Sequence, residues 1–203
     1  MSEKPPLIHV VDDDEAMRKS LCWLIGSVGL ETRDYASADA FCAAFSEDRP
    51  GCLILDVRMP GLSGLDLQET LNRLSARIPV IFLTGHGDVP MAARAFKAGA
   101  FDFLQKPCND QILLDRINDA IAEHRRRLAE SAMREELAAR AGALTSRERQ
   151  VAELVSLGLS TKEIAAQLGI SSKTAEIHRH NALAKMQADT SAELASLWTR
   201  LEN

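Results

Sequence analysis

Short apolar runs alternate with helix-like patterns along residues 5–122. Runs of aliphatic and β-branched residues predict strands, and apolar residues spaced three or four apart predict the helices between them. Two runs, 52–55 and 80–83, are continuously apolar, as expected for strands that are buried on both faces. Five strands separated by helices favour an α/β domain with a five-stranded parallel sheet and helices on both faces. The strands are expected at 7–11, 31–35, 52–55, 80–83 and 101–104, and the helices at 15–28, 37–45, 64–74 and 90–99 and from Asp110, as a cap, onward.

The pattern becomes entirely helical after residue 143. Thr145, Ser160 and Ser171 are typical of helix starts, and Gly158 and Gly169 are typical of helix ends. A short helix, a glycine turn and a second capped helix form a helix-turn-helix pattern. The C-terminal part is therefore predicted to be an all-α domain of four helices that contains a helix-turn-helix.

A charged segment, 123–142, lies between these two patterns and contains no proline, and no glycine before Gly142. It is rich in residues that favour helices, so we expect the last helix of the first domain to continue into a helical linker. The three arginines at 125–127 are interpreted as a solvent-exposed face. The expected boundaries are 5–122 for the first domain, 123–142 for the linker and 143–203 for the second domain.

The composition is that of a globular protein, with 46% hydrophobic and 26% charged residues. No apolar run approaches the length of a membrane span, so we expect no membrane association and a cytoplasmic protein whose four cysteines are reduced. The net charge of −5 divides into −6 over residues 1–122, +1 over 123–143 and 0 over 144–203. Any nucleic-acid contact by the second domain would depend on where its charges are placed.

Five polar side chains stand at the carboxyl ends of the predicted strands. Asp12 and Asp13 follow the first strand, Asp56 the third, Thr84 the fourth and Lys106 the fifth. In a parallel sheet these ends meet at one edge, where clustered carboxylates repel one another unless a cation neutralises them. Oxygen ligands suit Mg²⁺ (or Mn²⁺). The cation, Lys106 and the Thr84 hydroxyl would stabilise a transferring phosphoryl group, with Asp56 as the natural nucleophile.

Taken singly, these residues are unremarkable, because aspartate often caps a turn after a strand. Their occurrence together, at the ends of four of the five predicted strands, is what indicates a functional site. An enzyme of the haloacid-dehalogenase type would need a second acid two residues after the nucleophile, where Arg58 stands. A flavin-binding electron carrier would need a phosphate-cradling loop after the first strand, where this chain has three aspartates. We therefore expect that the chain is not an enzyme.

The strand ends resemble the receiver domain of two-component response regulators in the segments 10–14, 55–61, 83–88 and 101–107. The resemblance covers roughly residues 5–122. It implies a flavodoxin-like fold and phosphorylation of Asp56 by a sensor histidine kinase. It also implies that Asp13 and Asp56 are direct Mg²⁺ ligands, that Asp12 acts largely through water, and that the backbone carbonyl of Arg58 is a further ligand.

The same resemblance implies how the domain would switch. Thr84 and Phe103 match the positions that rotate together when the phosphoryl group arrives. The bond from Lys106 to the following proline is expected to be cis, and the positions of Arg58 and His86 are those that tune phosphate lifetime in the family. A homodimer is expected through the helix between Pro90 and Gly99 and the fifth strand, which would release the C-terminal domain to bind paired half-sites.

The third C-terminal helix has two unlike faces. Residues 175, 178, 182 and 186 are mainly small or apolar and should pack inward. The other face is polar except for Ile177 and could enter a major groove. It carries Lys173, Glu176, Ile177, His180 and Ala184. Phosphate contacts are expected from Thr161, Lys162, Ser172, Thr174, Arg179 and Lys185.

Three segments of this domain, 144–148, 158–165 and 170–179, resemble the LuxR/NarL/FixJ-type DNA-binding domain over about residues 140–200. The whole chain is most similar to FixJ-like regulators. The resemblance implies base contacts by Glu176, Ile177 and His180. Thr161 stands where the family usually has asparagine, and Ala175 where it usually has valine.

These observations predict a response regulator that accepts a phosphoryl group on Asp56, dimerises and binds promoter DNA to control transcription. The expected partners are a sensor histidine kinase, double-stranded DNA, a second copy of the chain and RNA polymerase. An output domain that binds RNA or another protein is the rival hypothesis, and competition of labelled DNA by RNA would separate the two.

Overall fold

A computed structural model describes residues 4–47, 49–85 and 89–202 of the chain. Its contacts divide the chain into two compact units, Met1–Leu128 and Ala129–Asn203. Each unit has buried core residues of its own, in two clusters in the first unit and one in the second.

The first unit is built on a five-stranded sheet in the order β2-β1-β3-β4-β5, in which every neighbouring pair is parallel. This confirms the predicted parallel sheet. Because β1 lies between β2 and β3, the strand order reverses there, and the carboxyl ends of β1 and β3 open side by side. The strands are β1 (Leu7–Val11), β2 (Glu31–Tyr35), β3 (Gly51–Leu55), β4 (Val80–Thr84) and β5 (Asp102–Gln105).

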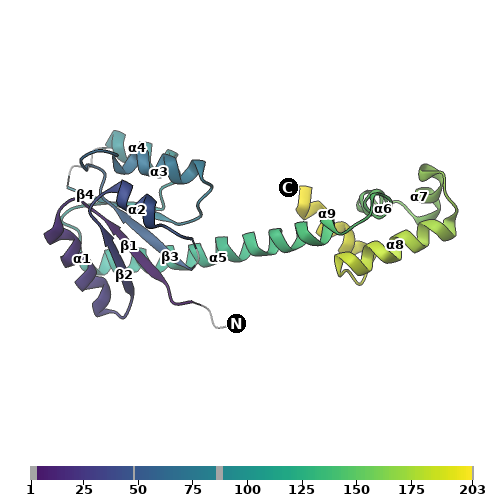
Figure 1. Ribbon diagram of the computed structural model, residues 1–203, viewed down its shortest axis with the longest axis horizontal. Helices are drawn as coiled ribbons and strands as arrows, with labels where there is room; N and C mark the ends of the chain where they lie inside the picture. The colour runs from purple at the N-terminus through teal and green to yellow at the C-terminus, as the bar shows by residue number, and fades with distance from the viewer. Residues whose placement is uncertain (1–3, 48, 86–88, 203) are drawn as a thin grey trace. The chain divides into compact units, whose positions relative to one another are not determined.

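Helices cover both faces of this sheet, as the sequence predicted (Figure 1). Alternate residues of the central strands face opposite ways, so Leu53 packs with α2, α3 and α4, whereas Ile54 packs with α1 and α5. This two-sided burial explains why β3 and β4 are apolar throughout. The helices are α1 (Glu15–Ser27), α2 (Ala38–Ala44), α3 (Gly64–Arg73), α4 (Val89–Lys97) and α5 (Asp110–Gly142).

The start of α5 differs from the sequence prediction by one residue. The side chain of Asn109 accepts hydrogen bonds from the backbone N–H groups of Gln111 and Ile112, at 2.8 and 3.3 Å. Asn109 is therefore the cap, and Asp110 is the first residue of the helix. Adjacent Asn and Asp are equally good caps, so the sequence pattern alone did not separate them.

Helix α5 runs without a break to Gly142, and the division between the two units falls inside it. His124 is buried in the first unit, where its Nδ1 atom lies 3.0 Å from the backbone nitrogen of Gly51. Arg125 and Arg126 are exposed, but Arg127 is only half-exposed and donates to the carbonyl of Arg77. The start of the charged segment 123–142 thus packs on the first unit.

The second unit contains the four predicted helices. Thr145 and Ser160 each form a capping box, Ser171 caps the third helix, and Gly169 ends the second in the left-handed region with φ 66°. Leu137 and Ala141, from the end of α5, belong to the core of this unit. The helices are α6 (Ser146–Ser156), α7 (Thr161–Leu168), α8 (Ser172–Met186) and α9 (Ser191–Glu202).

None of the helices in the described ranges combines the length and the apolar character that crossing a membrane requires.

Candidate functional site

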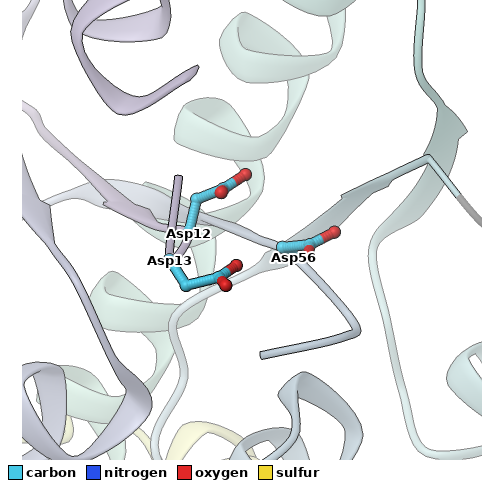
Figure 2. A group of neighbouring side chains, drawn as sticks. All are labelled: Asp12, Asp13 and Asp56. Atoms are coloured by element: carbon cyan, nitrogen blue, oxygen red, sulfur yellow. The ribbon is translucent and has the colours of Figure 1, made fainter. Parts of the chain in front are cut away.

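Three carboxylates meet at the carboxyl edge of the sheet (Figure 2). Asp12 and Asp13 follow β1 and Asp56 follows β3, and one oxygen from each lies within 4.8 Å of the others. Asp12 and Asp56 are buried, whereas Asp13 is exposed. The next residue, Asp14, caps α1 by accepting from the backbone of Ala16 at 2.8 Å. Of the run of three aspartates, two therefore face the cluster and the third starts a helix.

Lys106 and Thr84 complete this edge. The Lys106 ammonium lies 2.5 Å from Oδ2 of Asp12 and 3.7 Å from Oδ1 of Asp56. Thr84 is fully buried at the end of β4, and its hydroxyl forms a hydrogen bond with the Asp56 carboxylate. The backbone N–H of Lys106 donates to the Thr84 carbonyl at 2.9 Å, which ties the ends of β4 and β5 together. All five polar residues that the sequence placed at strand ends thus gather at one site.

The positive charge near Asp56 does not fully compensate the burial of its carboxylate. Burial raises the pKa of Asp56, and the Lys106 ammonium and the Thr84 hydrogen bond offset only part of that rise. Oδ1 of Asp56 is buried and has no hydrogen-bond partner among the described residues. A buried carboxylate oxygen without a hydrogen bond, beside two further carboxylates, fits the oxygen-ligand set of a divalent cation.

The backbone that carries Asp56 requires a glycine at the start of α3. A Cβ atom on Gly64 would lie 2.2 Å from the Asp56 carbonyl oxygen and 3.1 Å from the Leu55 side chain. The Gly64 N–H also donates to the carbonyl of Val57 at 3.0 Å, which closes the loop after β3. The sequence did not reveal this role, because a glycine after the cap residue Ser63 has no distinctive pattern.

The other predicted receiver residues lie near this edge. Phe103 is partly buried on β5, with its ring centre 6.0 Å from that of Phe82. The Arg58 side chain is exposed, in the loop after Asp56. The bond between Lys106 and Pro107 is cis, as the resemblance implied. His86 lies outside the described residues.

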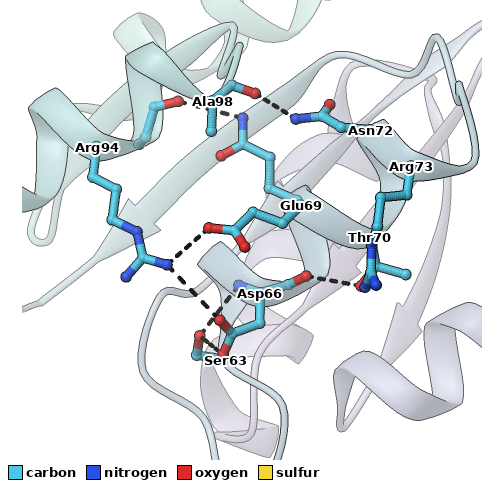
Figure 3. A network of polar contacts seen from close by, with 10 residues as sticks. Ser63, Asp66, Glu69, Thr70, Asn72, Arg73, Arg94 and Ala98 are labelled. Atoms are coloured by element: carbon cyan, nitrogen blue, oxygen red, sulfur yellow. Dashed lines mark hydrogen bonds and ion pairs between the residues drawn. The ribbon is translucent and has the colours of Figure 1, made fainter.

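A polar network that the sequence did not reveal joins α4 to α3 (Figure 3). The Arg94 guanidinium lies 2.8 Å from Glu69, and the Asn72 amide donates to the carbonyl of Ala98 at the end of α4, at 2.7 Å. The buried side chain of Gln68 donates to the carbonyl of Ala95. These contacts link α3 to the helix that was predicted to form the dimer surface.

The second candidate site is the outer face of α8. Ala175, Ala182 and Met186 are buried in the core, as predicted, and His178 is half-buried. The opposite face is exposed, and 53% of the surface of Ile177 is accessible. This exposed face carries Lys173, Glu176, Ile177, His180 and Ala184.

The side chains expected to contact phosphates differ in the hydrogen bonds and ion pairs that they form within the second unit. The Arg179 guanidinium donates to the Thr161 hydroxyl at 2.7 Å, which links α8 to the start of α7. Lys185 forms an ion pair with the buried Glu148 at 2.6 Å, so its ammonium is already engaged within the unit. Lys162 is exposed on α7, and Thr174 bonds with Ser171 near the start of α8. A hollow of about 240 Å³ opens beside Arg179, lined by Thr161, Glu176, Arg179, His180 and Leu183.

Family comparisons match both units. Residues 8–118 match the response regulator receiver domain, and residues 142–198 match the bacterial regulatory proteins of the luxR family. A receiver with a buried acidic cluster, followed by a LuxR-type helix-turn-helix domain, defines a class of protein: a two-component response regulator that controls transcription.

Proteins that are similar over the whole chain indicate which group of response regulators this is. The chain is 47% identical to the C4-dicarboxylate transport transcriptional regulatory protein DctR of Rhodobacter capsulatus over 192 residues, 94% of this chain and 98% of the relative. It is 43% identical to the transcriptional regulatory protein FixJ of Azorhizobium caulinodans over 197 residues, 97% and 93% of the two chains. The solved structure of the response regulator StyR is similar with a TM-score of 0.86 at 41% identity, covering 97% of this chain and 100% of that one.

This chain belongs to the FixJ/NarL family of two-component response regulators, those with a LuxR-type helix-turn-helix domain. Its relatives are named as transcriptional regulators, and the chain is a regulator rather than an enzyme. Its receiver implies a sensor kinase as a partner, and its LuxR-type domain implies DNA binding.

Proposed function

We propose that Asp56 accepts a phosphoryl group from a sensor histidine kinase, and that the phosphorylated chain dimerises and binds promoter DNA. The observation that carries this proposal is the position of Asp56: a buried carboxylate, beside two other carboxylates and a lysine, at the open edge of the sheet. No other side chain in the described part of this cluster combines burial with an unbonded carboxylate oxygen.

In the proposed transfer, a carboxylate oxygen of Asp56 attacks the phosphorus of a phosphohistidine. The new P–O bond forms as the P–N bond breaks, and the departing imidazole keeps the bonding pair and takes up a proton from solvent. Lys106 stabilises the negative charge on the phosphoryl oxygens, and the Thr84 hydroxyl offers a hydrogen bond to one of them. The product is an acyl phosphate, whose presence is the signal.

The donor set supports Mg²⁺ or Mn²⁺ at this site. Asp13 and Asp56 are the proposed direct ligands, with the backbone carbonyl of Arg58 as a third. The two oxygens of Asp12 already accept from the backbone of Asp14 at 2.9 Å and from Lys106 at 2.5 Å, which favours contact with the cation through water. The ion would neutralise the carboxylates and the charge on the phosphoryl group.

In the proposed switch, a change in the positions of Thr84 and Phe103 alters the surface formed by α4 and β5. Attachment of a phosphoryl group would draw the Thr84 hydroxyl toward it, and the partly buried Phe103 would move into the space that Thr84 leaves. The face of α4, within the segment from Pro90 to Gly99, and β5 would then pair with a second copy. The dimer would place two C-terminal domains on paired half-sites in the cytoplasm, where RNA polymerase could be recruited.

The proposed DNA contacts lie on two helices. Glu176, Ile177 and His180 would contact base edges from the exposed face of α8. Lys162 on α7, with Lys173, Thr174, Arg179 and Lys185 on α8, would contact phosphates, although Lys185 would have to share its charge with Glu148. A neutral domain can bind DNA in this way because these cations gather on α7 and α8.

The test is phosphorylation of the full chain by acetyl phosphate in Mg²⁺. We expect Asp56→Asn to abolish phosphate incorporation and the accompanying dimerisation, while the control Asp39→Asn, an exposed acid on α2, remains like the wild type. Undiminished incorporation by Asp56→Asn would refute the assignment. Incorporation without dimerisation in the wild type would refute only the proposed switch.

A further inference from the structure

We infer that Glu176 and Ile177 specify two neighbouring pyrimidines in each operator half-site, a cytosine for Glu176 and a thymine for Ile177. This inference rests on the proposed DNA binding and goes beyond it, because it assigns base identity to two side chains of this chain. The two residues are the fifth and sixth of α8, in the half of the helix that would enter the groove.

A carboxylate on this face is unfavourable for phosphate binding. Glu176 is exposed, and in the described part of the chain no ion pair joins it to a cation. Facing DNA, its charge would be repelled by the phosphates unless it accepted a hydrogen bond from a base. In the major groove cytosine presents an amino donor, whereas guanine presents two acceptors that would repel a carboxylate. Adenine offers an amino group beside an acceptor, so cytosine is the better match.

Ile177 presents a large apolar surface on a face whose other residues, apart from the small Ala184, are polar. It is 53% exposed, although β-branched apolar residues are usually buried. The apolar group that base pairs offer in the major groove is the C5-methyl of thymine. Contact with that methyl would bury surface that the free protein leaves in water.

Because Glu176 and Ile177 are adjacent in α8, the two bases that they contact should also be adjacent. Successive residues of an α-helix point about 100° apart and rise about 1.5 Å, so Glu176 and Ile177 can reach neighbouring base pairs but not the same edge. Arg179, held by the Thr161 hydroxyl at 2.7 Å, stands three residues beyond Glu176 with its charge already oriented. A phosphate contact there would fix the depth and register of α8 in the groove.

The experiment begins with the full chain, phosphorylated by acetyl phosphate in Mg²⁺, and a pool of randomised duplex DNA. Sequences retained by the protein are enriched and aligned. In the resulting consensus duplex, each thymine is then replaced singly by deoxyuridine, which removes the C5-methyl and leaves base pairing unchanged. In a second set of duplexes, each consensus cytosine is replaced singly by adenine, with the complementary base on the other strand. Binding is measured for the wild type, Glu176→Gln, Ile177→Ala and the control Glu153→Gln, which changes an exposed acid on α6.

We expect one uracil position in each half-site to weaken wild-type binding by about fourfold, the effect of one methyl group. Ile177→Ala should bind the thymine and uracil duplexes equally. Glu176→Gln should lose about tenfold of its preference for cytosine at the neighbouring position and gain affinity for adenine, because glutamine pairs with adenine in the major groove. Glu153→Gln should keep the wild-type preferences.

Three results would overturn the inference while leaving DNA binding intact: no sensitive uracil position, unchanged uracil sensitivity in Ile177→Ala, or an unchanged cytosine preference in Glu176→Gln. If the phosphorylated chain enriches no sequence at all, the proposed DNA binding fails, and the base assignment fails with it. Matching circular dichroism spectra of the variants would show that the exposed substitutions leave the fold intact.

Discussion

Lys106 lies nearer to Asp12 than to Asp56, at 2.5 Å against 3.7 Å. In this arrangement the lysine neutralises an acid that is not the proposed phosphoacceptor. Asp56 is left with its pKa raised by burial and with Oδ1 lacking a hydrogen bond from the described residues. The protein therefore compensates the charge of the Asp56 carboxylate only in part, which leaves this carboxylate able to bind a cation and to accept a phosphoryl group.

The lysine and a bound Mg²⁺ carry like charges in the same small site. Lys106→Gln should therefore bind Mg²⁺ more tightly, by about threefold to tenfold, because one repulsive charge is removed. The same variant should accept phosphate from acetyl phosphate at least about tenfold more slowly, because the phosphoryl oxygens lose a cation. Isothermal titration with MgCl₂ and a phosphate-incorporation assay would measure the two effects, and weaker Mg²⁺ binding by Lys106→Gln would contradict this account.

Glu148 gives the second unit a defined pH dependence. Hydrogen bonds from Lys185 and from the backbone of Thr145 lower the pKa of this buried glutamate to about 2. Because the pKa of the folded state is depressed, the stabilisation is present above the ordinary value of 4.5 and is lost as the pH falls from there toward 2. Glu148→Gln should reduce the free energy of unfolding by about 1 kcal/mol at pH 7 and remove this acid dependence.

The buried Trp198 allows this to be measured in the whole protein. In a Trp23→Phe background, urea unfolding followed by Trp198 fluorescence reports on the second unit alone. Equal stabilities of Glu148→Gln and its parent at pH 7 would show that the ion pair with Lys185 contributes nothing.

The first residue of helix α3, Gly64, lies against the carbonyl of Asp56. The position of the helix and that of the Asp56 backbone therefore depend on each other. A methyl group at Gly64 would lie 2.2 Å from that carbonyl oxygen, and either the helix or the loop would have to move. Gly64→Ala should destabilise the first unit by roughly 2–3 kcal/mol and slow phosphorylation of Asp56. The matched control is Gly26→Ala in α1, where a Cβ meets nothing within 4 Å.

Gly26→Ala should instead be neutral or stabilise by up to about 1 kcal/mol, because alanine is the better helix former. Thermal unfolding and acetyl phosphate labelling of both variants would test the pair. Opposite shifts in Tm are expected, and wild-type labelling by Gly64→Ala would show that the contact with Asp56 is unimportant.

The whole chain consists of two units, each with its own buried core, and one helix contributes to both. Ile117 and Ala120 of α5 belong to a core of the first unit, and Leu137 and Ala141 to the core of the second. A fragment 129–203 should therefore unfold cooperatively with nearly the stability that the unit has in the full chain. A fragment 143–203, which follows the boundary expected from sequence, should be less stable by roughly 2–4 kcal/mol, because it lacks two core residues.

Urea unfolding of the two fragments, followed by Trp198 fluorescence, measures this difference. Equal midpoints would mean that the end of α5 is dispensable, and that 143 is the functional boundary of the second domain.

Much of the fold and of the receiver site could be predicted from the sequence. Four mainly apolar runs, a weaker strand pattern at 31–35 and the intervening helices specified the parallel sheet. Burial on both faces requires apolar residues throughout β3 and β4. Since parallel strands end at one edge, the five polar residues after those strands specified the acidic cluster. Cap and glycine signals located α6, α7 and α8 to within a residue or two.

Contacts between elements distant in sequence could not be predicted in this way. The links from α3 to α4 through Asn72 and Arg94, and the pairing of Lys185 with Glu148, join residues whose patterns look like ordinary solvated polar faces. Their partners depend on how helices lie against one another, which local periodicity does not contain.

By itself the sequence determined the order of the elements and the residues of the acidic cluster, because hydrophobic period, caps and strand ends are local properties. The class of this protein was indicated by the resemblance of its motifs to known families. Only the tertiary structure decided that Lys106 lies against Asp12, that Gly64 must lack a side chain, and that the end of α5 completes the second core. These are distances between segments far apart in the chain, and they are fixed by packing and by the pairing of buried charges rather than by local sequence.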